Sequence, residues 1–303
     1  MSHTADSMSP TTDDPLLALQ AHNDALIAKV SEQISFGTFD EDDHQTLMQL
    51  VEGLGDPRGL MRLRFAEALG DIGEPATPFL VQALQTHENV VVRRAAAKTL
   101  TIIADPAAVP PLLEAFLHDE DTVVKGSSAG ALARTGEAAA PFLLDILASP
   151  DHAQNIKGHA AWALAFMGSE AEASLYQAIN SDSLDVRCAV IGALGHVAQE
   201  KTDEKSCGLL ISALTDPEPL IRAEAASALG QVNYPASVPH LILALQDTDL
   251  DVRKATINSL GKIGDPQAMD ALQTALNDEL SVIQTLARVA INQIERRAEE
   301  DDW

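Results

Sequence analysis

The sequence repeats one pattern of about thirty-one residues seven times, followed by a weaker eighth copy. In its clearest form the pattern reads Asp-Val-Arg-Lys-Ala-Thr-Ile-Asn-Ser-Leu-Gly, at residues 251–261. Copies aligned on the basic residue of this pattern follow one another at steps of 31, 32, 32, 30, 35, 31 and 31 residues. Self-similarity at this period is typical of stacked helical repeats, in which each repeat buries its apolar face against its neighbours. The aligned positions are Arg62, Arg93, Lys125, Lys157, Arg187, Arg222, Arg253 and Gln284.

Each copy divides into two predicted helices joined by a tight turn. Proline often begins the first helix, where its missing N–H has no intrahelical partner to lose. The second helix carries apolar residues at offsets −1, +3, +4 and +7 from the aligned position, which predicts one buried stripe. A small residue, often glycine, follows at +8. The sequence therefore predicts an all-α fold, an α-solenoid of about eight helix-turn-helix repeats. Side chains expected to cap the second helices lie four residues before the aligned position, at Asn89, Asp121, Ser183 and Asp249.

Composition along the chain predicts three segments. Residues 1–14 are polar and acidic with almost nothing to bury, so we expect a disordered tail. Residues 15–41 are expected to form an N-terminal capping helix, ending near Ile34 before Gly37, and a linker. The repeats then fill residues 42–303. The step of 35 residues contains a polar insertion at residues 199–206, which we expect to be an exposed loop.

The net charge of the chain limits the kinds of partner that it can bind. Acidic residues number 45 against 20 basic ones, for a net charge of −25. Nucleic acid is not expected as a partner, because its binding requires Lys and Arg to neutralise phosphates. No stretch of eighteen apolar residues is present, so no membrane insertion is expected. Cys188 and Cys207 fit neither a disulfide framework nor a metal site, and the N-terminus lacks a secretory pattern, so we expect a reducing, cytoplasmic location.

The pattern Val-Arg-x-x-Ala-x-x-Ala-Leu-Gly-x-Ile-Gly resembles the short HEAT-like repeat. More narrowly, residues 45–294 resemble the repeats of the E and F subunits of phycobilin lyases. The resemblance implies a right-handed superhelix whose second helices line a concave, protein-binding face. It also implies attachment of a linear tetrapyrrole to a cysteine of a phycobiliprotein, or its removal, generally by a two-subunit complex. Related members act in phycobilisome turnover or assembly without lyase activity. No catalytic residue of the family can be matched here, so enzymatic activity stays open, with a positioning or non-catalytic lyase subunit as one possibility.

Deoxyhypusine hydroxylases are a second group of HEAT-like solenoids to compare. They are recognised by four His-Glu pairs at helix starts, which hold two iron ions. This sequence has one such pair, His87-Glu88, and it falls in a predicted turn. The other histidines show no clustered ligand spacing, so no metal site is expected.

Outward positions of the second helices supply the candidate binding residues. Offsets +2, +5 and +9 share one helix face. In the fourth copy they are His159, Trp162 and Phe166, and glycines occupy neighbouring positions. We expect a shallow hollow with an aromatic floor, suited by ring stacking and ion pairing to a carboxylate-bearing linear tetrapyrrole such as phycocyanobilin as a transient ligand. The alternative is that Trp162 packs between repeats and the glycines only allow close helix approach. The candidate binding residues are Ser127, Arg134, His159, Trp162, Phe166 and His196.

Two further features have structural alternatives. Cys188 lies beside the candidate face, where a transient bilin adduct competes with the simpler role of a small, semi-buried helix residue. The recurring basic residue lies beside an acidic turn in every copy, which favours a structural role between repeats over a basic binding surface. Together the sequence predicts a protein-binding solenoid that handles phycobiliproteins, with a phycobiliprotein subunit or a second lyase-like subunit on its concave face. The competing hypothesis is a non-enzymatic scaffold or assembly factor for another complex, such as a photosystem.

Overall fold

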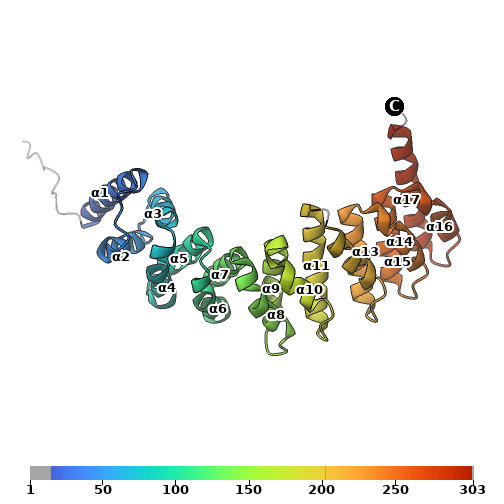
Figure 1. Cartoon of the computed structure of the whole chain (residues 1–303), viewed down its shortest axis with the longest axis horizontal. Helices are drawn as coiled ribbons and strands as arrows, with labels where there is room; N and C mark the ends of the chain where they lie inside the picture. Colours follow the sequence, from blue (N-terminus) through green and yellow to red (C-terminus); the bar gives the residue numbers. More distant parts are fainter. Residues whose placement is uncertain (1–14, 202, 302–303) are drawn as a thin grey trace, which may run out of the picture. The chain divides into compact units, whose positions relative to one another are not determined.

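The computed structural model describes residues 15–201 and 203–301, and the predicted disordered tail, residues 1–14, lies outside them. The described residues form α-helices joined by short 3-10 turns, with no strand among them. By internal packing the chain divides into two compact units, Met1–Arg134 and Thr135–Trp303. Within each unit, consecutive helices pair and the pairs stack along the chain (Figure 1). The predicted all-α solenoid fold is confirmed. No described helix is both long and apolar enough to cross a bilayer.

The first unit begins with a helix that covers its first pair. Helix α1 (Pro15–Ser35) packs against α3 and α2 and buries Leu26, Ile27 and Val30. Gly37 follows it in the left-handed region, at φ +64°. The boundaries predicted for the capping segment and the repeats, 15–41 and 42–303, stay a prediction. The pairs of this unit are α2 (His44–Gly53) with α3 (Gly59–Ile72), α4 (Thr77–Thr86) with α5 (Val90–Ile103), and α6 (Val109–His118) with α7 (Thr122–Arg134).

The second unit contains the remaining pairs, including the weak eighth copy. The first helix of each pair is its A helix, and the second is its B helix. The pairs are α8 (Ala140–Ala148) with α9 (Gln154–Met167), α10 (Glu172–Ala178) with α11 (Leu184–Lys201), α12 (Glu204–Ala213) with α13 (Pro219–Val232), α14 (Val238–Ala244) with α15 (Leu250–Ile263), and α16 (Met269–Ala275) with α17 (Ser281–Asp301). The eighth copy therefore forms a complete pair although Gln284 replaces its basic residue.

The prediction of a loop at residues 199–206 is wrong. Residues 199–201 continue α11, and residues 204–206 begin α12. Asp203 caps α12 by accepting a hydrogen bond from the backbone N–H of Ser206 at 2.6 Å. Glu200 reaches back to the backbone N–H of Ser169 at 3.4 Å, which ties the last turn of α11 to the preceding repeat. The insertion is polar because most of it is an exposed helix surface, and polarity alone does not separate such a surface from a loop.

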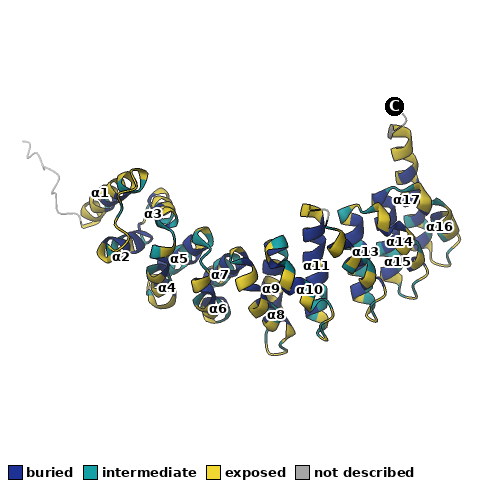
Figure 2. Cartoon of the chain, in the orientation of Figure 1, coloured by how far each residue is buried: buried dark blue, intermediate teal, exposed yellow. Residues whose placement is uncertain are grey.

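B helices pack side by side through the small residue at +8. The buried stripe follows the predicted offsets, for example Val252, Ile257 and Leu260 in α15, and Figure 2 shows buried residues concentrated between helices. A Cβ placed on Gly230 would lie 2.4 Å from Ser259 Oγ and 2.7 Å from Ser259 Cα, so only glycine allows this approach of α13 to α15. Ser259 Oγ uses the closeness to donate a hydrogen bond to the carbonyl oxygen of Ala226 at 2.7 Å.

The predicted N-caps are confirmed. Asp249 accepts hydrogen bonds from the backbone N–H groups of Asp251 and Val252, at 2.9 and 3.2 Å. The other three caps, Asn89, Asp121 and Ser183, also accept from the first turns of their helices. We expect Asp249→Ala to lower the free energy of unfolding by about 1 kcal/mol, because two N–H groups lose their acceptor. Urea denaturation followed by circular dichroism checks this value, and Asp249→Asn should recover most of the loss.

The repeated basic residue has the structural role that its position predicts. Arg222 donates from Nη1 to the carbonyl oxygen of Asp216 at 2.9 Å, and from Nε to Asp247 of the next pair at 2.6 Å. The side chain thus closes the turn of its own pair and holds the turn of the following one. The same donation to the carbonyl six residues earlier links Arg62 to Asp56, Arg93 to His87, Arg187 to Ser181, Arg253 to Asp247 and Gln284 to Asp278.

Candidate functional site

Helix α9 presents an exposed aromatic pair. Trp162 and Phe166 are 50% and 55% exposed, although both are large and apolar. Their ring centroids lie 5.5 Å apart with the planes tilted by 30°, as expected for residues one helical turn apart. No described neighbour lies within 4 Å of a Cβ placed on Gly158 or on Gly192. The open space beside these glycines contradicts the alternative that they serve close helix approach, whereas Trp162 is half exposed and its packing between repeats stays a prediction.

The other predicted residues lie on three helices. His159 precedes Trp162 on α9 and is exposed, and its Nδ1 lies 2.7 Å from the carbonyl oxygen of Asn155, which requires the proton on Nδ1. His196 is exposed on α11, the B helix that packs against α9. Ser127 and Arg134 lie on α7 in the first unit, so they form part of a different unit from the aromatic pair. The structure therefore places three of the six residues on one face of α9.

Neither cysteine is set up as a nucleophile. Cys188 is half-buried on α11, and burial, followed by the charge of Glu224, raises the pKa of its thiol. Cys207 is buried on α12, and burial raises the pKa of its thiol as well. A thiol with a raised pKa is almost entirely protonated at neutral pH and reacts slowly. Cys188 thus has the features of a small, semi-buried helix residue.

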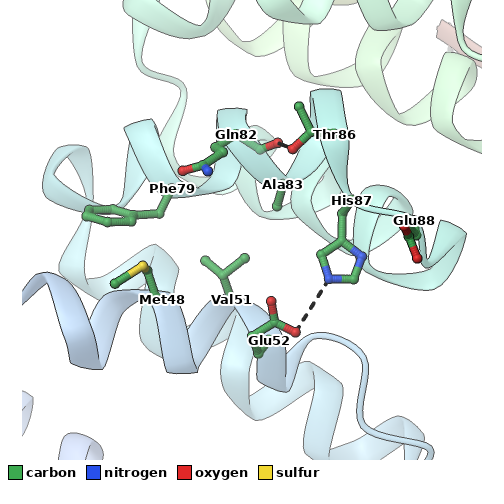
Figure 3. Close-up of a pocket in the computed structure, with 9 residues that line it drawn as sticks. All are labelled: Met48, Val51, Glu52, Phe79, Gln82, Ala83, Thr86, His87 and Glu88. Carbon is green, nitrogen blue, oxygen red and sulfur yellow. Dashed lines mark hydrogen bonds and ion pairs between the residues drawn. The ribbon is translucent and has the colours of Figure 1, made fainter.

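The structure also shows a pocket that the sequence did not predict. It has a volume of about 400 Å³ and lies between the A helices α2 and α4 of the first unit (Figure 3). Met48, Val51 and Phe79 supply apolar lining, while Glu52 and His87 lie at its polar end. The binding residues predicted from the repeat all lie on B helices, which explains the omission. The signal available in the sequence was Met48 and Phe79, two large apolar residues on the A helices of neighbouring repeats.

A groove of about 380 Å³ lies between the B helices α3 and α5 of the same unit. Leu63 and Ile102 are exposed in it, and Lys98 adds positive charge, whereas Arg94 is paired with Asp121. Exposed apolar side chains on B helices are therefore not confined to α9. Within residues 15–201 and 203–301, no group of three or more His, Cys, Asp or Glu side chains is arranged to hold a metal ion.

Comparison with known proteins identifies the repeats. The model of HEAT repeats matches residues 47–133 and 208–292, more than half of the chain. The bilin biosynthesis protein MpeU of Synechococcus sp. (strain WH8020) is 41% identical over 206 residues, which is 68% of this chain and 69% of that protein. This chain belongs to the HEAT-repeat family that includes MpeU. The resemblance noted in the sequence, to HEAT-like repeats of the phycobilin lyase type, is confirmed.

A solved structure shares the fold. The karyopherin Kap121p, bound to the extreme C-terminus of the protein phosphatase Cdc14p, aligns over 96% of this chain and 38% of its own length. The TM-score is 0.57 at 13% sequence identity, so the likeness concerns the fold alone. Human deoxyhypusine hydroxylase aligns over 83% of this chain and 96% of its own, at 23% identity and a TM-score of 0.37.

Proposed function

We propose that this HEAT-repeat protein handles phycobiliproteins in the cytoplasm, by holding a phycobiliprotein subunit or its bilin during chromophore attachment, assembly or turnover. The observation that carries the proposal is the half-exposed pair Trp162 and Phe166, in a chain 41% identical to a bilin biosynthesis protein over two thirds of its length. Large exposed aromatic residues are uncommon on a solvated helix surface and are frequent at the centres of binding sites.

The surface around the pair fits a flat, conjugated ligand. Stacking on an aromatic ring requires open access to its face, and the open space above Gly158 and Gly192 supplies such access beside the pair. His159, and His196 on the neighbouring helix, add polar groups at this face that donate to carboxylates when protonated. Ser127 and Arg134, on the first unit, are proposed as further contacts to a larger protein partner.

Any catalysis by this protein would result from positioning the bilin next to the acceptor thiol. Both thiols of this chain are held protonated, which favours a cysteine of the partner as the bilin acceptor. The protein would then act by holding the ethylidene group of the bilin close to that thiol, so that the sulfur and its proton add across the double bond, and correct placement alone accelerates such reactions strongly. A second lyase-like subunit would complete such a site.

Bilin titration of Trp162→Ala tests this proposal. We expect its dissociation constant for phycocyanobilin to rise about tenfold or more, since one central tryptophan often contributes above 1.4 kcal/mol to binding. The absorbance of phycocyanobilin reports binding in the same way for the wild-type protein and for every variant. Phe142→Ala removes an exposed aromatic ring from α8 and serves as the control. Unchanged affinity, or a large loss of melting temperature in Trp162→Ala, would contradict the proposed role.

The second candidate function is a non-enzymatic scaffold or assembly factor for another complex, such as a photosystem. The exposed Leu63 and Ile102 favour it, because they extend the apolar surface of the B helices beyond α9. Affinity capture from a lysate of phycobilisome-containing cells separates the two. Phycobiliprotein subunits that are lost with Trp162→Ala support the first function. Photosystem subunits whose capture survives Trp162→Ala support the second.

A further inference from the structure

The A helices of the first unit form an apolar groove on a surface that the proposed function does not use. The pocket between α2 and α4 shares Met48, Glu52 and His87 with a second pocket of about 500 Å³ that reaches Leu19 on α1. The two pockets therefore join into one groove across α1, α2 and α4. Met48, at their junction, is 51% exposed. Volumes of this size are typical of binding pockets.

The apolar end of the groove is held in place by neighbouring side chains. The rings of Phe79 and His44, the first residue of α2, pack edge to face, with 5.3 Å between centroids and 60° between planes. Val51 is buried beneath, and Figure 3 shows Met48, Val51 and Phe79 gathered at one end of the pocket. Leu19 continues the apolar surface on α1, where it is exposed. A partner that covers these residues removes their apolar surface from water, which favours binding.

At the polar end of the pocket, His87 orients the carboxylate of Glu52. His87 Nδ1 accepts a hydrogen bond from the backbone N–H of Asn89 at 3.0 Å, so the ring carries a proton on Nε2. Nε2 then donates to Glu52, with 3.4 Å between the nitrogen and the carboxylate oxygen (Figure 3). The Glu52 side chain is nevertheless 71% exposed, so most of its hydrogen-bonding capacity faces solvent. His87 thus orients a carboxylate at the edge of an apolar pocket.

The charged side chains that line the groove are acidic. Glu52 and Glu88 are exposed on its lining, and among the residues that the structure describes neither lysine nor arginine lines either of the two pockets. Asp56 also lines the groove, but its carboxylate is already paired with Arg58 and accepts a hydrogen bond from Asn23. An apolar floor edged by unneutralised carboxylates favours a partner that brings positive charge and repels one that brings negative charge.

We propose that this groove is a docking site for a basic amphipathic segment of a partner protein, whose apolar residues cover Met48 and Phe79 while a lysine or arginine pairs with Glu52. The B helices then stay available for the function proposed above. This makes the first unit a two-sided module, with an acidic apolar groove on its A helices and the groove containing Arg94 and Lys98 on its B helices.

The test must separate docking from general attraction, because a protein of charge −25 attracts any basic peptide. The probe is a fluorescent amphipathic helical peptide of leucine, alanine and lysine, titrated into the full chain. A second peptide carries glutamate in place of every lysine. Met48→Asp adds a negative charge while it removes the apolar floor, so general attraction predicts tighter binding and docking predicts weaker binding. Leu243→Asp adds the same charge at an exposed leucine of α14 and serves as the control.

We expect the lysine peptide to bind the wild-type protein, Met48→Asp to weaken it about tenfold, and Leu243→Asp to leave it unchanged or slightly tighter. Glu52→Lys should weaken binding more than Glu114→Lys, which reverses the charge of an exposed glutamate on α6. In a methyl spectrum of labelled methionines, the Met48 signal, assigned with Met48→Leu, should shift on titration. The proposal is overturned if the peptide does not bind, if the glutamate peptide binds equally well, or if Met48→Asp and Leu243→Asp behave alike.

Discussion

Gly230→Ala should destabilise the protein strongly, although alanine is the better helix former by about 1 kcal/mol. The added methyl group would lie 2.4 to 2.7 Å from three atoms of Ser259, one of which is the backbone Cα. A backbone atom does not rotate away, so α13 and α15 must separate. Overpacking of this kind costs roughly 1–3 kcal/mol. Separation also lengthens the hydrogen bond from Ser259 to Ala226, which adds about 1 kcal/mol. Packing therefore outweighs helix propensity.

The matched control, Gly208→Ala, should change the stability of the protein in the opposite direction. Gly208 lies inside α12, is exposed, and has no described neighbour within 4 Å of an added Cβ. Gly208→Ala should stabilise the protein by roughly 0.5–1 kcal/mol, because helix propensity acts there alone. Urea denaturation of both variants measures the difference. If Gly230→Ala also stabilises the protein, the close approach of the B helices does not limit its stability.

The repeat could be predicted from the sequence because its rules are local and occur in every copy. Asp249 lies four residues before the aligned Arg253, and Gly230 lies eight residues after the aligned Arg222. These offsets recur between copies, so each copy supports the assignment of the others. The outward face of α9 followed from the same offsets. Whether Trp162 is buried depends on the neighbouring pairs, and the structure was needed to show that it is half exposed.

The groove on the A helices could not be predicted in this way. Its shape depends on contacts between residues far apart in the sequence, such as His44 with Phe79 and Glu52 with His87. These residues do not recur at equivalent positions in other copies, so periodicity carries no information about them. Residues 199–206 were misassigned for a related reason, since the contact that fixes α11 joins Glu200 to Ser169 of another repeat.

Arg222→Ala should be the second strongly destabilising change. Arg222 donates hydrogen bonds to both carboxylate oxygens of Asp247, from Nε at 2.6 Å and from Nη2 at 2.8 Å. It also donates one to the carbonyl oxygen of Asp216. Its side chain is only 14% exposed, so water does not replace these bonds well. Removal leaves a mostly buried carboxylate without its main partner. We expect a loss of roughly 2–4 kcal/mol in the free energy of unfolding, between the values for a charged hydrogen bond and for a broken buried pair.

The pH dependence of this loss identifies its cause. The Arg222 guanidinium holds the pKa of Asp247 below its usual range, so the folded state binds the proton more weakly than the unfolded state does. The stabilisation is therefore complete above the unfolded pKa of about 3.9 and is lost as pH falls below it. The difference in unfolding free energy between wild type and Arg222→Ala should be full at pH 7 and shrink between about pH 4 and pH 2. Arg296→Ala, at an exposed position of α17, should change stability by less than about 0.5 kcal/mol at every pH. A difference that stays constant down to pH 2 would assign the loss to side-chain packing and not to the pairing of Arg222 with Asp247.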